Sequence, residues 1–106
     1  MNQLLVVITS LPSSETAKEL GRKLIHEKLA ACVQIHGGVQ SIYPWEGRLC
    51  EADEVLLVAK TTQAKWTFIR DYLKQHHPYD VPEIIAQAID QYDDAYAQWI
   101  QAELDC

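Results

Sequence analysis

Hydrophobic and polar residues along the chain alternate between two spacings, and together these predict a mixture of strands and helices. An unbroken apolar run at residues 4–8 is typical of a strand that is buried on both faces and lies centrally in a sheet. Apolar residues then recur every three or four positions from an N-cap at Ser13 or Ser14 to about Leu29, which predicts a helix. Gly21 lies on the apolar side of this helix, where it would allow a close approach to the sheet.

The middle of the chain predicts a β-hairpin. Residues 32–43 have the pattern of a second strand, interrupted by Gly37 and Gly38, and residues 54–61 have the pattern of its return strand. The aromatic segment 43–48 between them predicts a turn centred on a Glu-Gly pair. The side chains expected to share one face of the first strand are Val33, Ile35, Val39, Ser41 and Tyr43.

The remaining segments predict a helix, a short connector, a strand and a last helix. The second helix is expected to end at His76, because Pro78 disfavours helical geometry for His77. Residues 82–89 predict the fourth strand and residues 90–104 the third helix. The side chains expected to face inward on that helix are Tyr92, Ala95, Tyr96, Trp99 and Ala102.

The element order β-α-β-β-α-β, followed by a helix, predicts an α+β fold of the ferredoxin-like split βαβ type, with two helices on one face of an antiparallel sheet. Residues 1–106 are expected to form a single domain, because no linker or repeat divides them. The other face of the sheet would be open although its strands are apolar on both faces. We therefore expect the last helix or other copies of the chain to cover it, and we expect self-association.

Composition narrows the classes of partner. Nine basic and fifteen acidic residues give a net charge of −6, which disfavours nucleic acid and anionic membranes and mildly favours cations. The N-terminal apolar run spans only five residues and no positive charge precedes it, so neither a signal peptide nor a membrane span is expected. Three widely spaced cysteines favour reduced thiols and a cytoplasmic protein.

Candidate chemistry is concentrated in the connector at residues 76–83, where two prolines stiffen a run of titratable groups. Neutral imidazole is a good ligand for copper or zinc, although this spacing is specific to no single metal. The candidate metal ligands are His77, Glu83, His76 and Asp80. A structural role stays open for each histidine as a packed side chain, and for Glu83 as a solvated or ion-paired carboxylate.

Five further side chains are candidates for a cleft or an oligomer interface: Tyr43, Trp45, Tyr79, Lys60 and Cys32. The aromatic ones are of the type that lines pockets or anchors interfaces. The lysine is either a cation facing a ligand or a solvated strand end, and Cys32 favours packing in the core. Cys50 and Cys106 would be reactive if exposed. We expect no enzymatic activity, because the sequence pairs no nucleophile with a base and spaces no two carboxylates for acid–base catalysis.

Five segments, in order over nearly the whole chain, resemble the CutA family of divalent-cation-tolerance proteins. They are LAACVQI at 29–35, SIYPWEG at 41–47, KTT at 60–62, HPYDVPEI at 77–84 and YAQW at 96–99. The resemblance implies a ferredoxin-like fold and a cytoplasmic homotrimer whose hairpins pair across subunits. It also implies a role in tolerance to copper and other divalent metals. Glu83 and both histidines match the family pattern. Pro44 stands where relatives often have a second aromatic residue, and Thr9, a poor copper ligand, stands where some have a cysteine.

Two functional hypotheses follow. The first is a cytoplasmic homotrimer that binds copper or a similar divalent cation at an inter-subunit cleft, through the four connector ligands named above. The second is a trimeric signalling or scaffold protein whose clefts take a small metabolite or a partner protein.

Overall fold

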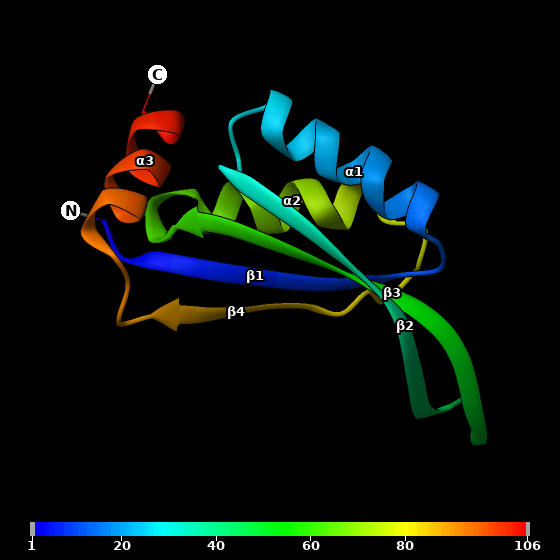
Figure 1. Cartoon of the computed structure of the whole chain (residues 1–106). Coiled ribbons are helices and arrows are strands. Elements are labelled where there is room, and N and C mark those ends of the chain that lie inside the picture. The colour runs from blue at the N-terminus through cyan, green and yellow to red at the C-terminus, as the bar shows by residue number, and fades with distance from the viewer. Residues whose placement is uncertain (1, 106) are drawn as a thin grey trace.

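The computed structural model describes residues 2–105, which form one four-stranded antiparallel sheet and three α-helices (Figure 1). The strands are β1 (Leu4–Leu11), β2 (Cys32–Trp45), β3 (Arg48–Thr62) and β4 (Ile84–Ile89). The helices are α1 (Ser14–His26), α2 (Trp66–His76) and α3 (Asp94–Leu104), with a 3-10 turn at Gln63–Lys65 ahead of α2. The predicted α+β class and the predicted order of elements are confirmed.

Strand β1 lies centrally, in the sheet order β2-β3-β1-β4, as its unbroken apolar run predicted. It pairs antiparallel with both β3 and β4, so that Ile8 lies between Val58 and Ile85. Helices α1 and α2 cover one face of this sheet (Figure 1). Side chains from these helices and from β1 and β3 form the fully buried core beneath them: Val7, Leu11, Leu24, Leu57, Ala59, Ile69 and Leu73.

Helix α1 begins where the sequence predicted and ends earlier. The Ser13 Oγ accepts a hydrogen bond from the backbone N–H of Thr16 at 3.2 Å, which is an N-cap. The helix ends at His26 rather than near residue 29, because Lys28 turns into the left-handed region with φ of 56°. The predicted close approach at Gly21 is confirmed, since a Cβ atom there would lie 2.9 Å from the Val33 Cγ1.

A β-bulge at Gly37–Gly38 reverses which side chains of β2 face the helices. His36 pairs with Leu56, but Val39 pairs with Glu54, so β2 contains one more residue than β3 across this step. Gly38 has φ of 72°, a conformation that few other residues adopt at low cost. The prediction that odd-numbered residues from 33 to 43 share one face is therefore wrong, because side chains alternate strictly and one extra residue inverts the alternation.

Beyond the bulge, β2 and β3 form a long hairpin that bends away from the side of the sheet that carries α1 and α2 (Figure 1). The turn lies at Glu46 and Gly47, both with positive φ, as the Glu-Gly pair predicted. Strand β3 begins at Arg48 rather than at residue 54, because the hairpin stays paired to its tip. The arm gives the molecule an elongated shape of 45 × 26 × 22 Å.

Helix α3 packs at the end of the sheet that is farthest from the hairpin (Figure 1). It begins at Asp94, because the Asp93 carboxylate caps it by accepting from the Tyr96 N–H at 3.2 Å. The predicted inner stripe is wrong. The buried side chains are Ala97, Ile100 and Leu104, which contact Leu4 and Ile89, whereas Tyr92, Tyr96 and Trp99 are exposed. Two apolar stripes compete on this helix, and the compact aliphatic one fits the end of the sheet.

Within residues 2–105, helix α3 covers the face of the sheet opposite α1 and α2 only around Leu4. Alternation places Val6, Ile8 and Val58 on this face, where they are half-buried, and Ile85 beside them is 52% exposed. The described part of the chain therefore leaves an apolar sheet face partly open, as the sequence predicted. No helix within residues 2–105 is long and apolar enough to cross a membrane.

Candidate functional site

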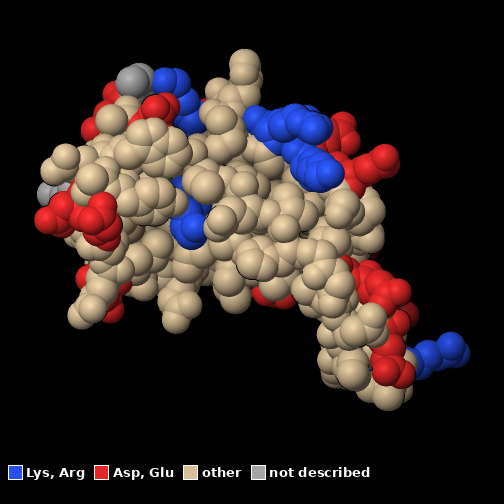
Figure 2. All heavy atoms as spheres, viewed as in Figure 1, with Lys and Arg blue, Asp and Glu red and all other residues tan. Residues whose placement is uncertain are grey.

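A cleft of about 670 Å³ lies beneath the bent hairpin, between this arm and the connector that joins α2 to β4. The hollow and the acidic side chains along the hairpin are visible in Figure 2. The volume of this cleft is typical of a site for a small molecule rather than for a single ion. The lining residues are Ser10, Ser41, Ile42, Tyr43, Trp45, Glu54, Pro78, Tyr79, Asp80, Val81 and Glu83.

The β2 bulge determines what the hairpin contributes to this cleft. Because the alternation is inverted after Gly38, the side chains of Ser41, Tyr43 and Trp45 lie on the same face as Glu54. Two predicted cleft residues, Tyr43 and Trp45, thus reach the cleft from the hairpin, and they are 40% and 47% exposed.

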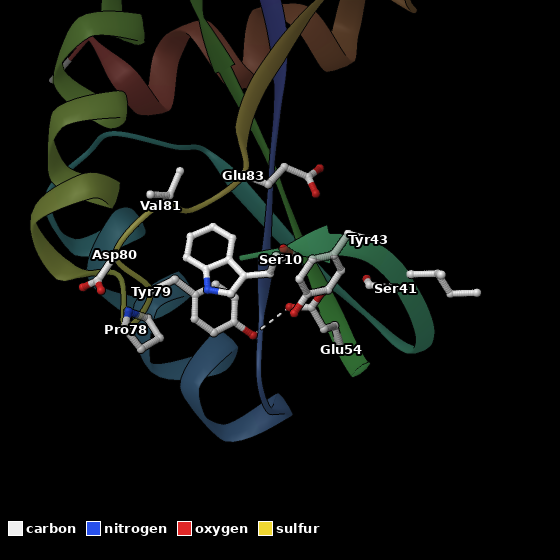
Figure 3. Close-up of a pocket in the computed structure, with 11 residues that line it drawn as sticks. Ser10, Ser41, Tyr43, Glu54, Pro78, Tyr79, Asp80, Val81 and Glu83 are labelled. Carbon is white, nitrogen blue, oxygen red and sulfur yellow. Dashed lines mark hydrogen bonds between the residues drawn. The ribbon is translucent and has the colours of Figure 1, made fainter. Parts of the chain in front are cut away.

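The connector contributes Tyr79, Asp80 and Glu83, which were all predicted candidates. The Tyr79 hydroxyl donates a hydrogen bond of 2.7 Å to the Glu54 Oε2 (Figure 3). Burial, followed by the hydrogen bond to the Glu54 carboxylate, raises the pKa of the Tyr79 hydroxyl well above its usual value. The phenol therefore remains a hydrogen-bond donor, and it joins the connector to β3.

His77 holds the connector against β1 and uses both ring nitrogens to do so. Its Nε2 lies 2.8 Å from the Ser10 carbonyl oxygen and 3.0 Å from the Thr9 Oγ1, and its Nδ1 accepts the Tyr79 N–H at 3.1 Å. Because a carbonyl only accepts and an N–H only donates, the imidazole is neutral with its proton on Nε2. Burial lowers the pKa of His77, although the Ser10 carbonyl and the Glu54 charge partly oppose this shift. The predicted extended geometry before Pro78 is confirmed, with φ of −76° and ψ of 139°.

The other predicted candidates lie outside the cleft. His76 is exposed, and its ring centroid lies 4.2 Å from that of Tyr72. The Lys60 Nζ donates to the Gln34 Oε1 at 2.9 Å across β2 and β3. Cys32 is half-buried rather than buried in the core, because it opens β2 at an edge of the sheet.

The remaining cysteines take no part in the described cleft lining. Cys50 is half-buried and pairs across the hairpin with Tyr43. Cys106, a candidate reactive thiol, lies outside the described residues.

The predicted ligands are not gathered into one metal centre within the protomer. Asp80 and Glu83 line the cleft, while His77 faces β1 and His76 faces solvent. Within residues 2–105, no group of three or more His, Cys, Asp or Glu side chains is placed to hold a metal ion. Divalent ions in proteins require about four or more ligands, so one protomer supplies only part of such a site.

Sequence reasoning missed Glu54, which is 8% exposed and lies at the inner end of the cleft. In the sequence it is merely the charged residue before an apolar strand. Its position beside Tyr79 depends on contacts between residues 25 positions apart. A carboxylate directly before a buried run was the only local signal, and many solvated strand ends show the same pattern.

Comparison with known proteins gives a consistent result. A family model described as CutA1 divalent ion tolerance protein matches residues 5–103. The divalent-cation tolerance protein CutA of Thermus thermophilus is 41% identical over 96 residues, which cover 91% of this chain and 93% of that protein. The chloroplastic protein CutA of Arabidopsis thaliana is 39% identical over 97 residues. That match covers 92% of this chain but 53% of the plant protein, so the chain spans about half the length of that relative.

The architecture is also shared with solved structures. The crystal structure of the divalent ion tolerance protein CutA1 from Ehrlichia chaffeensis superimposes with a TM-score of 0.95 at 27% sequence identity. The alignment covers 100% of this chain and 99% of the other. The described fold, including the long hairpin, is therefore that of an established structural group.

Proposed function

This chain belongs to the CutA1 divalent ion tolerance family. We propose that it contributes to tolerance of divalent ions by binding copper or a similar divalent cation in the cleft beneath the hairpin. The observation that carries the proposal is the lining of that cleft, where Glu54, Asp80 and Glu83 supply carboxylate oxygens and no basic residue is among the described lining. Carboxylate oxygen is a ligand for hard and borderline divalent ions. His77 acts in this proposal as a positioning residue, because both of its nitrogens are already bonded.

We propose that the protein is a homotrimer and that a second protomer completes the cation site. Two features support this assembly. The sheet face around Ile8 and Ile85 is apolar and partly open, and Leu49 near the hairpin tip is 73% exposed. One protomer also supplies too few ligands for a divalent ion. A solution mass close to that of one 12.1 kDa chain at micromolar concentration would contradict the assembly.

Calorimetric titration with Cu(II), repeated with Zn(II), tests the cation site. We expect Glu83→Gln to weaken metal binding by about tenfold or more, because losing a ligand costs at least as much as losing a group that orients one. Glu51→Gln is the control, since Glu51 is an exposed carboxylate of the hairpin that does not line the cleft. Equal affinities in the wild-type protein, Glu83→Gln and Glu51→Gln would contradict the assignment of metal to this cleft.

A second function is favoured by the size of the cleft. A volume of about 670 Å³ with aromatic walls supports a trimeric signalling or scaffold protein that binds a small metabolite or a partner segment. A thermal-shift screen over charged metabolites tests it, because a ligand that binds only the folded state raises the melting temperature. Stabilisation by metal ions alone would favour the first function.

We further propose that the protein acts by binding rather than by catalysis, and that it does so in the cytoplasm. The two titratable groups best placed for proton transfer are engaged in positioning bonds, since His77 holds β1 and the Tyr79 hydroxyl donates to Glu54. The thiols Cys32 and Cys50 are free, which is consistent with a reducing compartment.

A further inference from the structure

We infer that the cleft beneath the hairpin binds an organic polycation, an aliphatic diammonium or polyammonium compound, through a combination of aromatic rings and carboxylates. This goes beyond tolerance of metal ions, because it assigns a different class of ligand to the same cleft. It does not depend on metal binding there.

The first support is the aromatic lining. Tyr43 and Trp45 reach the cleft from the hairpin and Tyr79 reaches it from the connector, so three rings come from two separate elements. Aromatic faces attract ammonium and guanidinium groups within about 6 Å through the ring quadrupole. They are not ligands for a bare divalent metal ion, which binds oxygen, nitrogen or thiolate donors. Three aromatic side chains in one cleft thus favour an organic cation.

The second support is the charge at the inner end of the cleft. Glu54 is 8% exposed, and its described hydrogen bond comes from a neutral phenol, that of Tyr79. The ion pair found in the described residues joins Arg70 and Asp71, which lie on α2 and not in the cleft. A largely buried carboxylate is costly unless a cation compensates it. The described lining includes no Lys, Arg or His, so a cation that entered the cleft would supply the positive charge that this lining lacks.

The third support is the number and placement of the acidic groups. Asp80 and Glu83 line the connector side of the cleft, while Glu54 belongs to β3 (Figure 3). A ligand with two or more separated positive charges can therefore meet Glu54 on β3 and Glu83 on the connector, with its methylene chain along the aromatic rings, while Asp80 adds negative charge farther along the connector (Figure 3). A cleft of about 670 Å³ accommodates such a chain.

Isothermal titration of the full chain with putrescine and spermidine at fixed ionic strength tests the inference, with 1,4-butanediol as the uncharged match for putrescine. We expect saturable binding of both amines and no binding of the diol. We expect Glu54→Gln to lower the affinity for both amines by about tenfold or more, because a charged partner at a desolvated site is lost. Trp45→Leu should lower this affinity by about threefold to tenfold, the range of a cation–π contact.

Two control variants separate the cleft from the rest of the surface. Glu51→Gln removes a hairpin carboxylate outside the cleft, and Phe68→Leu removes an aromatic side chain that is 64% exposed on α2. Both should bind the amines like the wild-type protein. Equal binding of putrescine and 1,4-butanediol, unchanged amine affinity in Trp45→Leu, or absence of amine binding because a neighbouring protomer fills the cleft would each overturn the inference.

The same titrations keep this inference distinct from the metal proposal. Trp45→Leu should leave Cu(II) affinity unchanged, because an indole ring does not ligate copper. Cu(II) binding without amine binding would overturn the polycation assignment and leave the metal proposal standing. Amine binding that depends on Glu54 and Trp45, without Cu(II) binding, would support the polycation assignment and contradict the metal proposal.

Discussion

The two faces of the central sheet carry similar apolar residues but have different surroundings. On the face beneath α1 and α2, Leu57 is fully buried, whereas its neighbour Leu56 points to the opposite face and is half-buried. The covered face is completed within one chain. The other face combines aliphatic side chains, an acidic cleft and a bent arm, and only its Leu4 end is covered by α3. The comparison teaches that one face stabilises the protomer and that the other is available for recognition.

The connector after α2 ties these two faces together. His77 hydrogen-bonds to Thr9, whose side chain is fully buried on the helix-covered face. Two residues later, Tyr79 hydrogen-bonds to Glu54 on the cleft face. The geometry of the cleft therefore depends on anchoring to the stable side of the sheet.

The largest expected effect comes from a matched pair of adjacent leucines. Leu57→Ala should reduce the free energy of unfolding by about 3 kcal/mol, because it leaves a cavity in a fully buried site. Leu56→Ala should cost about 1 kcal/mol or less in the protomer, since its side chain already contacts solvent. Urea denaturation at several protein concentrations measures both. Equal losses that do not change with concentration would contradict the distinction between the faces.

Removal of the His77 anchor is expected to have an intermediate effect. His77→Ala should cost about 2 kcal/mol, because it removes the hydrogen bonds of both ring nitrogens and leaves the Tyr79 N–H without its described partner. It should also weaken ligand binding in the cleft. His76→Ala is the control, since that exposed neighbour lies outside the cleft. If the two variants were equally stable, the anchoring role of His77 would be refuted.

A smaller effect is expected from Tyr79→Phe, which keeps the aromatic ring and removes the hydroxyl bonded to Glu54. The loss in stability should be about 1 kcal/mol. The hydroxyl's raised pKa also predicts that the wild-type protein loses stability as the pH rises above 10, because only the unfolded chain then releases this proton. Denaturation curves at pH 8 and pH 10.5 should show a smaller difference for Tyr79→Phe than for the wild-type protein.

The smallest effect concerns the protonation of His77. Its pKa is lowered from the usual 6.5 in the folded chain, so the unfolded chain binds a proton first as the pH falls. The stabilisation from the neutral ring is fully present above pH 6.5 and is lost as the pH falls below this value towards the folded pKa. Melting temperatures between pH 7.5 and 5.5 should fall more steeply in the wild-type protein than in His77→Ala. Parallel curves would show that His77 does not titrate differently on folding.

Local patterns predicted the parts of the fold that are determined locally. The apolar run after Gln3 identified the central strand, the Glu46-Gly47 pair identified the turn, and Pro78 identified the end of α2. The inner face of α3 was not predictable in this way, because Trp99 and Ile100 both belong to apolar stripes and only the shape of the sheet end selects between them.

The candidate site was predictable only in part, for the same reason. Tyr79, Asp80 and Glu83 are close in sequence and drew attention as a cluster. Glu54 and Ser10 join them only through strand pairing, which a local pattern does not contain. The engagement of both His77 nitrogens likewise depends on β1, which lies 67 to 68 positions earlier in the chain.

The bulge at Gly37–Gly38 makes the chemistry of the cleft depend on the register of β2 rather than on its length. Deletion of one glycine codon there would leave a single residue opposite Val55, so His36 and Val39 would keep their partners, and Tyr43 and Trp45 would still face the cleft. A slip of the outer hairpin by one residue at unchanged length would instead restore plain alternation from His36 onward. Tyr43 and Trp45 would then point away from Glu54, and Ile42 and Pro44 would take their places, without a single amino-acid substitution in the cleft.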